Sequence, residues 1–147
     1  MKEKEFEDYF TELQADMISI ALEYVNNDAD KIYVYCSYEP EVYYFNVFYQ
    51  IKGQIVHKHE LNNIFKDTYD TSIERQKVVM KVGREDLEKI LGACVEYKRE
   101  MPTEMKLFYD VNLNKLQGEY KYNLIYSQTD DLLPNDIFNR WMEEIKN

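Results

Sequence analysis

The residues best suited to chemistry in this sequence are the two histidines, which are separated by a single lysine in His57-Lys58-His59-Glu60. In a β-strand, residues two apart point to the same side, so His57 and His59 could offer two imidazoles to a metal ion, with an oxygen from Glu60. No third or fourth ligand is visible in the sequence. Two interpretations therefore stay open: a metal site, or solvent-facing histidines at the end of a strand.

Paired carboxylates, notably Asp130-Asp131 and Glu143-Glu144, are the next candidates, because general acid–base catalysis needs a carboxylate whose pKa is shifted in a pocket of low dielectric. With 28 Asp and Glu in the chain, the sequence does not distinguish such a group from a solvated one. The four glycines are too dispersed for a GxGxxG or GxxxxGK[ST] phosphate loop, and no serine lies in a GxSxG elbow. We therefore predict no catalytic residue and no cofactor, and we expect that the protein is not an enzyme.

The elements that must position these residues follow from hydrophobic spacing and turn residues. Apolar side chains at steps of three and four predict helices, whereas runs rich in tyrosine, phenylalanine and β-branched residues predict strands. The expected order is a helix over about 3–26, strands over 32–38, 41–51 and 54–59, helical sequence over 72–99, strands over 105–111 and 116–126, and a closing helix from Pro134.

This order predicts an α+β fold in one domain, residues 1–147: an antiparallel sheet of about five strands with helices packed mainly on one face (α-βββ-α(α)-ββ-α). Apolar and polar side chains alternate along residues 116–126, so we expect one packed face and one wet face there. We also expect Gly83 to divide the helical sequence, since glycine costs about 1 kcal/mol in a helix interior.

The charge of the chain is unevenly distributed. The formal charge is −10, and residues 1–30 alone hold nine acids against two lysines. At about 100° per residue, five of these acids fall on one stripe that flanks the apolar face of the first helix: Glu5, Asp8, Glu12, Asp16 and Glu23. Acids four residues apart repel each other, so this acidic row is either a solvated face or a surface for a basic partner. The same acidity argues against direct binding of nucleic acid.

Aromatic residues of the second strand are the other candidate contact surface. Tyr43, Phe45 and Tyr49 alternate with a second set that includes Tyr44 and Phe48. If one face of the sheet is open, the rings at 43, 45 and 49 would be presented to a partner, and tyrosine is a favoured interface residue. A further helix or a dimer partner could equally cover them.

Four segments together resemble the YezG-like immunity proteins, which are small antitoxins encoded beside secreted polymorphic toxins in Gram-positive bacteria. They are Lys31-Ile32-Tyr33-Val34-Tyr35, Tyr43-Tyr44-Phe45-Asn46-Val47-Phe48-Tyr49, the run from Met101-Pro102 to Tyr109-Asp110, and Ile137-Phe138-Asn139-Arg140-Trp141. The resemblance covers nearly the whole chain in element order, and it implies an immunity-protein-like α+β domain.

The resemblance also implies a function: binding and neutralising a cognate secreted toxin, often a nuclease, whose surface is basic. The contact residues would then be the acidic row and the rings at 43, 45 and 49. No signal peptide or membrane-length apolar run is visible, so we expect a cytoplasmic protein with no membrane partner. The alternatives are a non-catalytic adaptor or homo-oligomeric structural protein, a homodimer included, and less favourably a small metal-dependent enzyme that uses His57 and His59.

Overall fold

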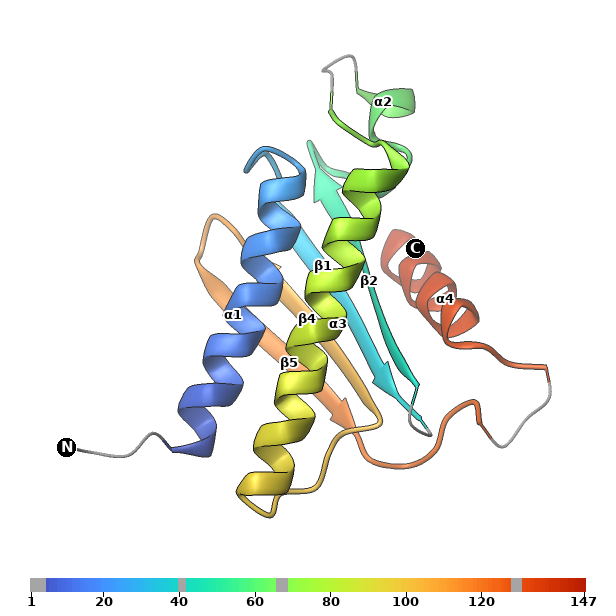
Figure 1. The fold of residues 1–147 in the computed structure, drawn as a ribbon. Coiled ribbons are helices and arrows are strands. Elements are labelled where there is room, and N and C mark those ends of the chain that lie inside the picture. Colours follow the sequence, from blue (N-terminus) through green and yellow to red (C-terminus); the bar gives the residue numbers. More distant parts are fainter. Residues whose placement is uncertain (1–4, 40–41, 66–68, 128–130) are drawn as a thin grey trace.

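An open antiparallel sheet in the order β3-β2-β1-β4-β5 forms the centre of the protein (Figure 1). The structure is a computed structural model that describes residues 5–39, 42–65, 69–127 and 131–147, and within these ranges the chain forms five strands and four helices. The elements are α1 (Phe6–Tyr24), β1 (Lys31–Tyr38), β2 (Tyr43–Ile51), β3 (Gln54–His57), α2 (Leu61–Ile64), α3 (Ile73–Glu96), β4 (Glu104–Asp110), β5 (Lys115–Lys121) and α4 (Pro134–Lys146). The predicted α+β fold and element order are confirmed.

Helices cover the two faces of the sheet unequally. The long helices α1 and α3 lie side by side over one face, whereas the shorter α4 lies on the other side of the sheet (Figure 1). The main core fills the space under α1 and α3, and a smaller cluster under α4 joins Phe138, Trp141 and Met142 to Tyr33, Tyr35 and Phe48. Both faces of β1 and β2 are buried because these strands carry apolar or aromatic side chains at nearly every position.

Helix α3 runs through Gly83 without a break, so the prediction that this glycine divides it is wrong. The reason is a close contact with the sheet: Gly83 is buried, and a Cβ added there would overlap the ring of Phe45 on β2. Glycine here serves packing between helix and sheet rather than the end of a helix. The helix begins where Ser72 caps it, with the side-chain oxygen of Ser72 accepting a hydrogen bond from the backbone N–H of Arg75 at 3.3 Å.

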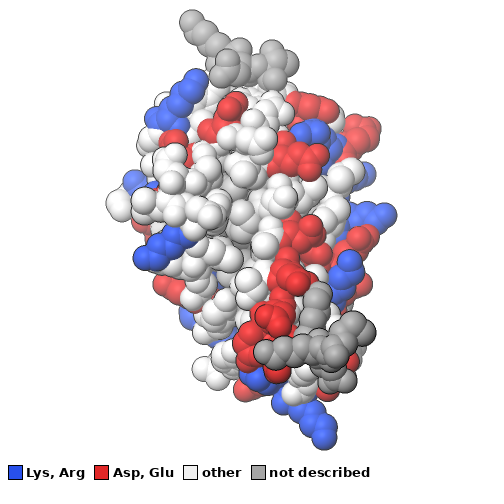
Figure 2. Space-filling view, turned by 90° about the vertical axis from the view of Figure 1, so that its left-hand side faces the viewer, with Lys and Arg blue, Asp and Glu red and all other residues white. Residues whose placement is uncertain are grey.

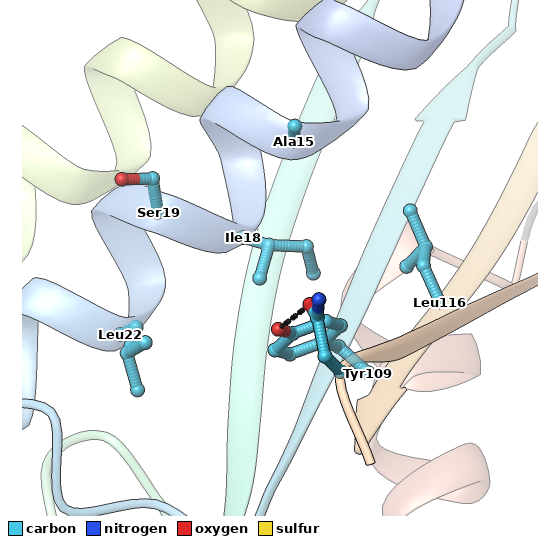
Figure 3. A pocket seen from close by; sticks show the side chains of 7 residues that line it. Ala15, Ile18, Ser19, Leu22, Tyr109 and Leu116 are labelled. Carbon is cyan, nitrogen blue, oxygen red and sulfur yellow. Dashed lines mark hydrogen bonds between the residues drawn. The ribbon is translucent and has the colours of Figure 1, made fainter. Parts of the chain in front are cut away.

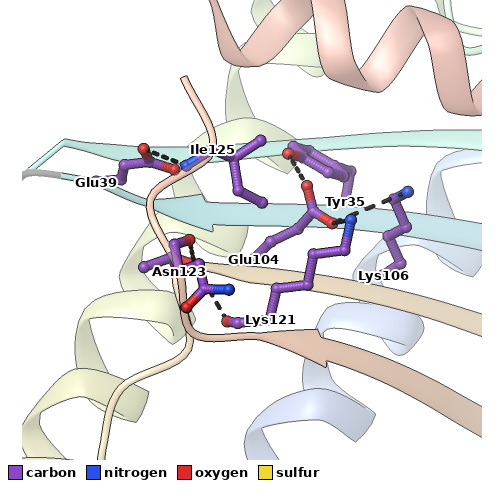
Figure 4. Close-up of polar contacts among 8 residues, drawn as sticks. Tyr35, Glu39, Glu104, Lys106, Lys121, Asn123 and Ile125 are labelled. Carbon is purple, nitrogen blue, oxygen red and sulfur yellow. Dashed lines mark hydrogen bonds and ion pairs between the residues drawn. The ribbon is translucent and has the colours of Figure 1, made fainter. Parts of the chain in front are cut away.

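The returning strand β5 ends at Lys121, five residues earlier than predicted. Beyond it, the chain is held by a buried carboxylate just after β1. Oε1 of Glu39 accepts a hydrogen bond from the backbone N–H of Ile125 at 2.7 Å (Figure 4), and others from the backbone N–H groups of Tyr126 and Ser127 at 3.0 and 2.9 Å. Burial raises the pKa of Glu39, but the donated hydrogen bonds outweigh it and lower that pKa overall. The alternating pattern continues past Lys121, but the chain there is not a strand. The backbone N–H groups of residues 125–127 bind the Glu39 carboxylate instead of a neighbouring strand.

A second buried carboxylate, Glu104, joins the strands on the side of the sheet that faces α4. Its Oε2 accepts a hydrogen bond from the Tyr35 hydroxyl at 2.7 Å, and its Oε1 lies 3.7 Å from Nζ of Lys121 and 3.9 Å from Nζ of Lys106 (Figure 4). Two ammonium groups and a hydroxyl thus compensate the removal of this carboxylate from water.

Substitution of Gly83 tests the contact between α3 and β2. Gly83→Ala is expected to lower the free energy of unfolding by about 1–3 kcal/mol, because the added methyl overpacks the interface with Phe45. Gly92→Ala is the matched control: it lies on the same helix with open space at the Cβ position, so it is expected to stabilise by up to about 1 kcal/mol. Urea unfolding measures both, and equal stability of the two variants would contradict the close approach.

Candidate functional site

All five residues of the acidic row are exposed: Glu5, which caps the start of α1, and Asp8, Glu12, Asp16 and Glu23 within it. Asp8 also closes the start of the helix, because its Oδ2 accepts a hydrogen bond from the backbone N–H of Glu5 at 3.1 Å. Figure 2 views the molecule from the side of α1 and the β4–β5 hairpin, and it shows acidic side chains gathered beside a wide area without charged residues.

A groove of about 590 Å³ runs between α1 and α3 beside this row. Its charged lining consists of four acids and one lysine: Glu12 and Asp16 from α1, and Asp86, Glu96 and Lys89 from α3. The uncharged part is Tyr9, Leu13, Gly92 and Ala93. The structure therefore joins two residues of the predicted acidic row to three charged residues of α3 that the sequence did not single out.

Asp86 is the most unusual residue of this groove, since its side chain is only 3% exposed. The carboxyl group of Asp16 lies within hydrogen-bonding range of it, and its Oδ2 has no hydrogen-bond partner among the described residues. Burial and the neighbouring Asp16 raise the pKa of Asp86 to about 7, although the charge of Lys89 opposes the shift. Near neutral pH, Asp86 is thus protonated in about half of the molecules.

The sequence does contain one signal for Asp86. It lies in phase with the buried stripe of α3, which includes Val79, Leu87 and Ile90, at a position where an apolar residue is expected. A lone acid within an apolar stripe is expensive to bury unless it has a partner. The group that Asp86 meets is a second acid, Asp16 of α1, which does not compensate its charge. Only the packing of the two helices shows which acid of α1 it is.

The other flank of α1 carries an uncharged pocket of about 350 Å³ (Figure 3). Its lining is Ala15, Ile18, Ser19 and Leu22 from α1, with Tyr109, Asn114 and Leu116 from the β4–β5 hairpin. The Tyr109 hydroxyl donates a hydrogen bond to the side-chain oxygen of Asn114, as the dashed line in Figure 3 marks. Helix α1 therefore has an acidic groove on one side and an apolar hollow on the other.

The predicted aromatic contact surface is wrong for Phe45 and Tyr49, which are fully buried under α1 and α3. The Tyr49 hydroxyl donates a hydrogen bond to the carbonyl oxygen of Ala21 on α1 at 2.6 Å. Tyr43 is half-buried, and its ring lies 4.9 Å from that of Tyr38. Alternation along β2 correctly groups these side chains on one face, but that face lies under α1 and α3.

The two histidines lie with their ring centroids 4.1 Å apart. His59 is exposed, whereas His57 is buried, so the prediction of solvent-facing histidines is wrong for His57. Burial, with the charge of Lys58 next, lowers the pKa of His57 to about 3. Glu60 does not join the imidazoles, because its Oε1 accepts a hydrogen bond from the backbone N–H of His57 at 3.1 Å. Within the described ranges, no three His, Cys, Asp or Glu side chains are grouped so that they could hold a metal ion.

The paired carboxylates do not form a common site. Asp130 lies outside the described residues, and Asp131 is exposed. Glu143 and Glu144 are exposed on α4, where Oε1 of Glu143 lies 3.4 Å from Nζ of Lys146. Among the helices of the described residues, none is both long and apolar enough to cross a membrane.

No protein-family model matches the chain, and no curated protein matches it. The resemblance to the YezG-like immunity proteins therefore rests on the residue pattern and the element order.

Asp86→Asn tests the buried carboxyl pair. A pKa raised in the folded state means that the contribution of Asp86 to stability is fully present below its ordinary value of 3.8 and is lost as pH rises from there through about 7. The melting temperature of the variant is therefore expected to exceed that of wild type by more at pH 8 than at pH 5. Glu88→Gln, an exposed position two residues along α3, is the control and should show no such pH-dependent difference. A gain for Asp86→Asn that is equal at both pH values would contradict the assigned pKa.

Proposed function

We propose that this protein is a cytoplasmic immunity protein that binds and neutralises a basic toxin domain, with a nuclease as the toxin class that fits best. The observation that carries the proposal is the acidic surface of α1, where the exposed row adjoins a groove lined by four acids and one lysine. A nuclease needs a basic surface to hold phosphate, so it presents the complementary charge.

Charge and apolar contact have different roles in such a complex. Exposed acids such as Glu5, Asp8 and Glu23 accelerate encounter and select a basic partner, but rim charges add little affinity. Affinity needs apolar burial, which the hollow lined by Ile18, Leu22 and Leu116 offers on the opposite flank of the same helix. With Phe45 and Tyr49 in the core, this hollow replaces them in the proposed contact surface.

A homo-oligomeric structural protein is the second candidate, and β5 favours it. This strand is at the edge of the sheet, and six of its seven residues are exposed, Leu116 being half-buried. Tyr120, Tyr122 and Leu124 are 37%, 48% and 48% exposed, although alternation predicts that their face is packed. An exposed edge strand is a template for pairing with another chain. A stable dimer of the isolated protein that is lost on substitution of β5 would favour this candidate.

Binding to the product of the neighbouring gene tests the immunity function. With an inactive variant of that product, we expect a complex whose association slows steeply as salt concentration rises. Replacing Glu5, Asp8, Glu12 and Glu23 together by glutamine is expected to slow association at low salt by about tenfold.

The matched control changes the same amount of charge elsewhere. Replacement of Glu74, Glu88, Glu143 and Glu144 by glutamine, on α3 and α4, is expected to alter the association rate by less than about twofold. Equal slowing in both variants would mean that only net charge matters, and the absence of any complex at low salt would contradict the proposed function.

A further inference from the structure

The acidic groove between α1 and α3 contains a defined arrangement of two carboxyl groups, one of which is buried. Three observations meet there: a side chain that is 97% buried, a carboxylate oxygen of that side chain without a hydrogen-bond partner among the described residues, and a second carboxyl group within hydrogen-bonding range. A buried oxygen without a partner is uncommon in folded proteins, and it indicates a position where a donor belongs. Once both carboxyl groups are ionised, a cationic donor can pair with both of them.

We infer that Asp16 and Asp86 form an anchor site for one arginine side chain of the basic partner. The inference rests on the proposed function, since it names what that partner inserts. A planar guanidinium carries five N–H donors and can bridge two carboxylates at once, whereas a lysine ammonium is a compact and strongly hydrated charge.

The walls of the groove favour guanidinium for a second reason. Tyr9 offers a ring on which a guanidinium can stack, while Leu13 and Ala93 contact the aliphatic part of the side chain. Gly92 leaves open space, because a Cβ built there meets nothing within 4 Å. A groove of about 590 Å³ accepts one large side chain together with water.

Arginine binding is an exchange of cations. In the free protein below about pH 7, Asp86 holds a proton. The entering guanidinium replaces it, the proton leaves to solvent, and the total charge of the site stays the same. The other titratable or charged groups that face the pair are Tyr9 and Glu12 from α1, Glu85, Lys89 and Glu96 from α3, and the buried thiol of Cys36 from β1. Burial and Asp86 raise the pKa of this thiol.

The experiment titrates the full chain with Nα-acetyl-arginine methylamide and follows the carboxyl ¹³C signals of Asp16 and Asp86 by NMR. We expect saturable shifts of both signals, with the corresponding lysine compound binding at least fivefold more weakly. Binding should be about tenfold tighter at pH 8 than at pH 6, because the ionised fraction of Asp86 rises from about one-tenth to about nine-tenths around its pKa of about 7.

Two variants separate the site from the fold. Asp86→Asn removes one carboxylate, and Gly92→Leu fills the groove with no change of charge at a position with open space. Both are expected to abolish the saturable shifts and to keep a cooperative thermal transition. Glu88→Gln, exposed on α3 outside the groove lining, is expected to bind as wild type does.

Three outcomes would contradict the arginine anchor site. The first two are equal binding of the lysine compound and undiminished binding to Asp86→Asn. The third is displacement of the arginine compound by MgCl2 or CaCl2 at equal concentration, which would indicate a metal site. The small probe also keeps this inference separate from the proposed function. If the arginine compound does not bind but the salt-sensitive complex with the basic partner still forms, only the anchor site is ruled out. If the arginine compound binds but no complex with a basic partner forms, only the proposed function is ruled out.

Discussion

The contact between the Phe45 ring and the backbone at Gly83 determines where α3 lies, and the rest of the functional surface depends on that position. Because the helix has no side chain at this point, it can approach β2 closely. Because α3 lies close to the sheet, α1 packs beside it. Asp86 is then buried between the two helices, near Asp16 of α1 and Cys36 of β1. The acidic groove is thus a product of helix–sheet packing, although the acids that line it come from two distant segments.

Buried acids have different roles in this fold, and their hydrogen-bond partners decide which. Oε1 of Glu39 accepts hydrogen bonds from backbone N–H groups, and Glu104 accepts one from a hydroxyl beside two ammonium groups. Each carboxylate therefore has donors within the chain, although Oε2 of Glu39 has no hydrogen-bond partner among the described residues. Asp86 faces another carboxyl group instead, and burial then works against its ionised form. Such uncompensated burial is more typical of a site than of a structural residue, since folding alone would favour an apolar side chain there.

The arrangement of helices and strands could be predicted from the sequence, because apolar spacing and ring-rich runs report on local structure. What failed depended on contacts between distant segments. Gly83 has the propensity of a helix breaker, but it is retained inside α3 by Phe45. The alternation of β2 sorts Phe45 and Tyr49 correctly from Phe48, yet it does not reveal which face lies under two helices. The acidic row on α1 is visible from helical periodicity, whereas its partner Asp86 is visible only as an acid in an apolar stripe.

The small cluster under α4 gives the protein an optical reporter. Trp141 is the one tryptophan in the sequence, and its ring lies 5.8 Å from that of Tyr33 and 5.2 Å from that of Phe48. The fluorescence of Trp141 therefore reports whether α4 is packed against β1 and β2, on the side of the sheet opposite the acidic groove. Circular dichroism, which is dominated by α1 and α3, follows the other layer. Comparison of the two signals during unfolding would show whether the C-terminal helix detaches by itself or together with the whole domain.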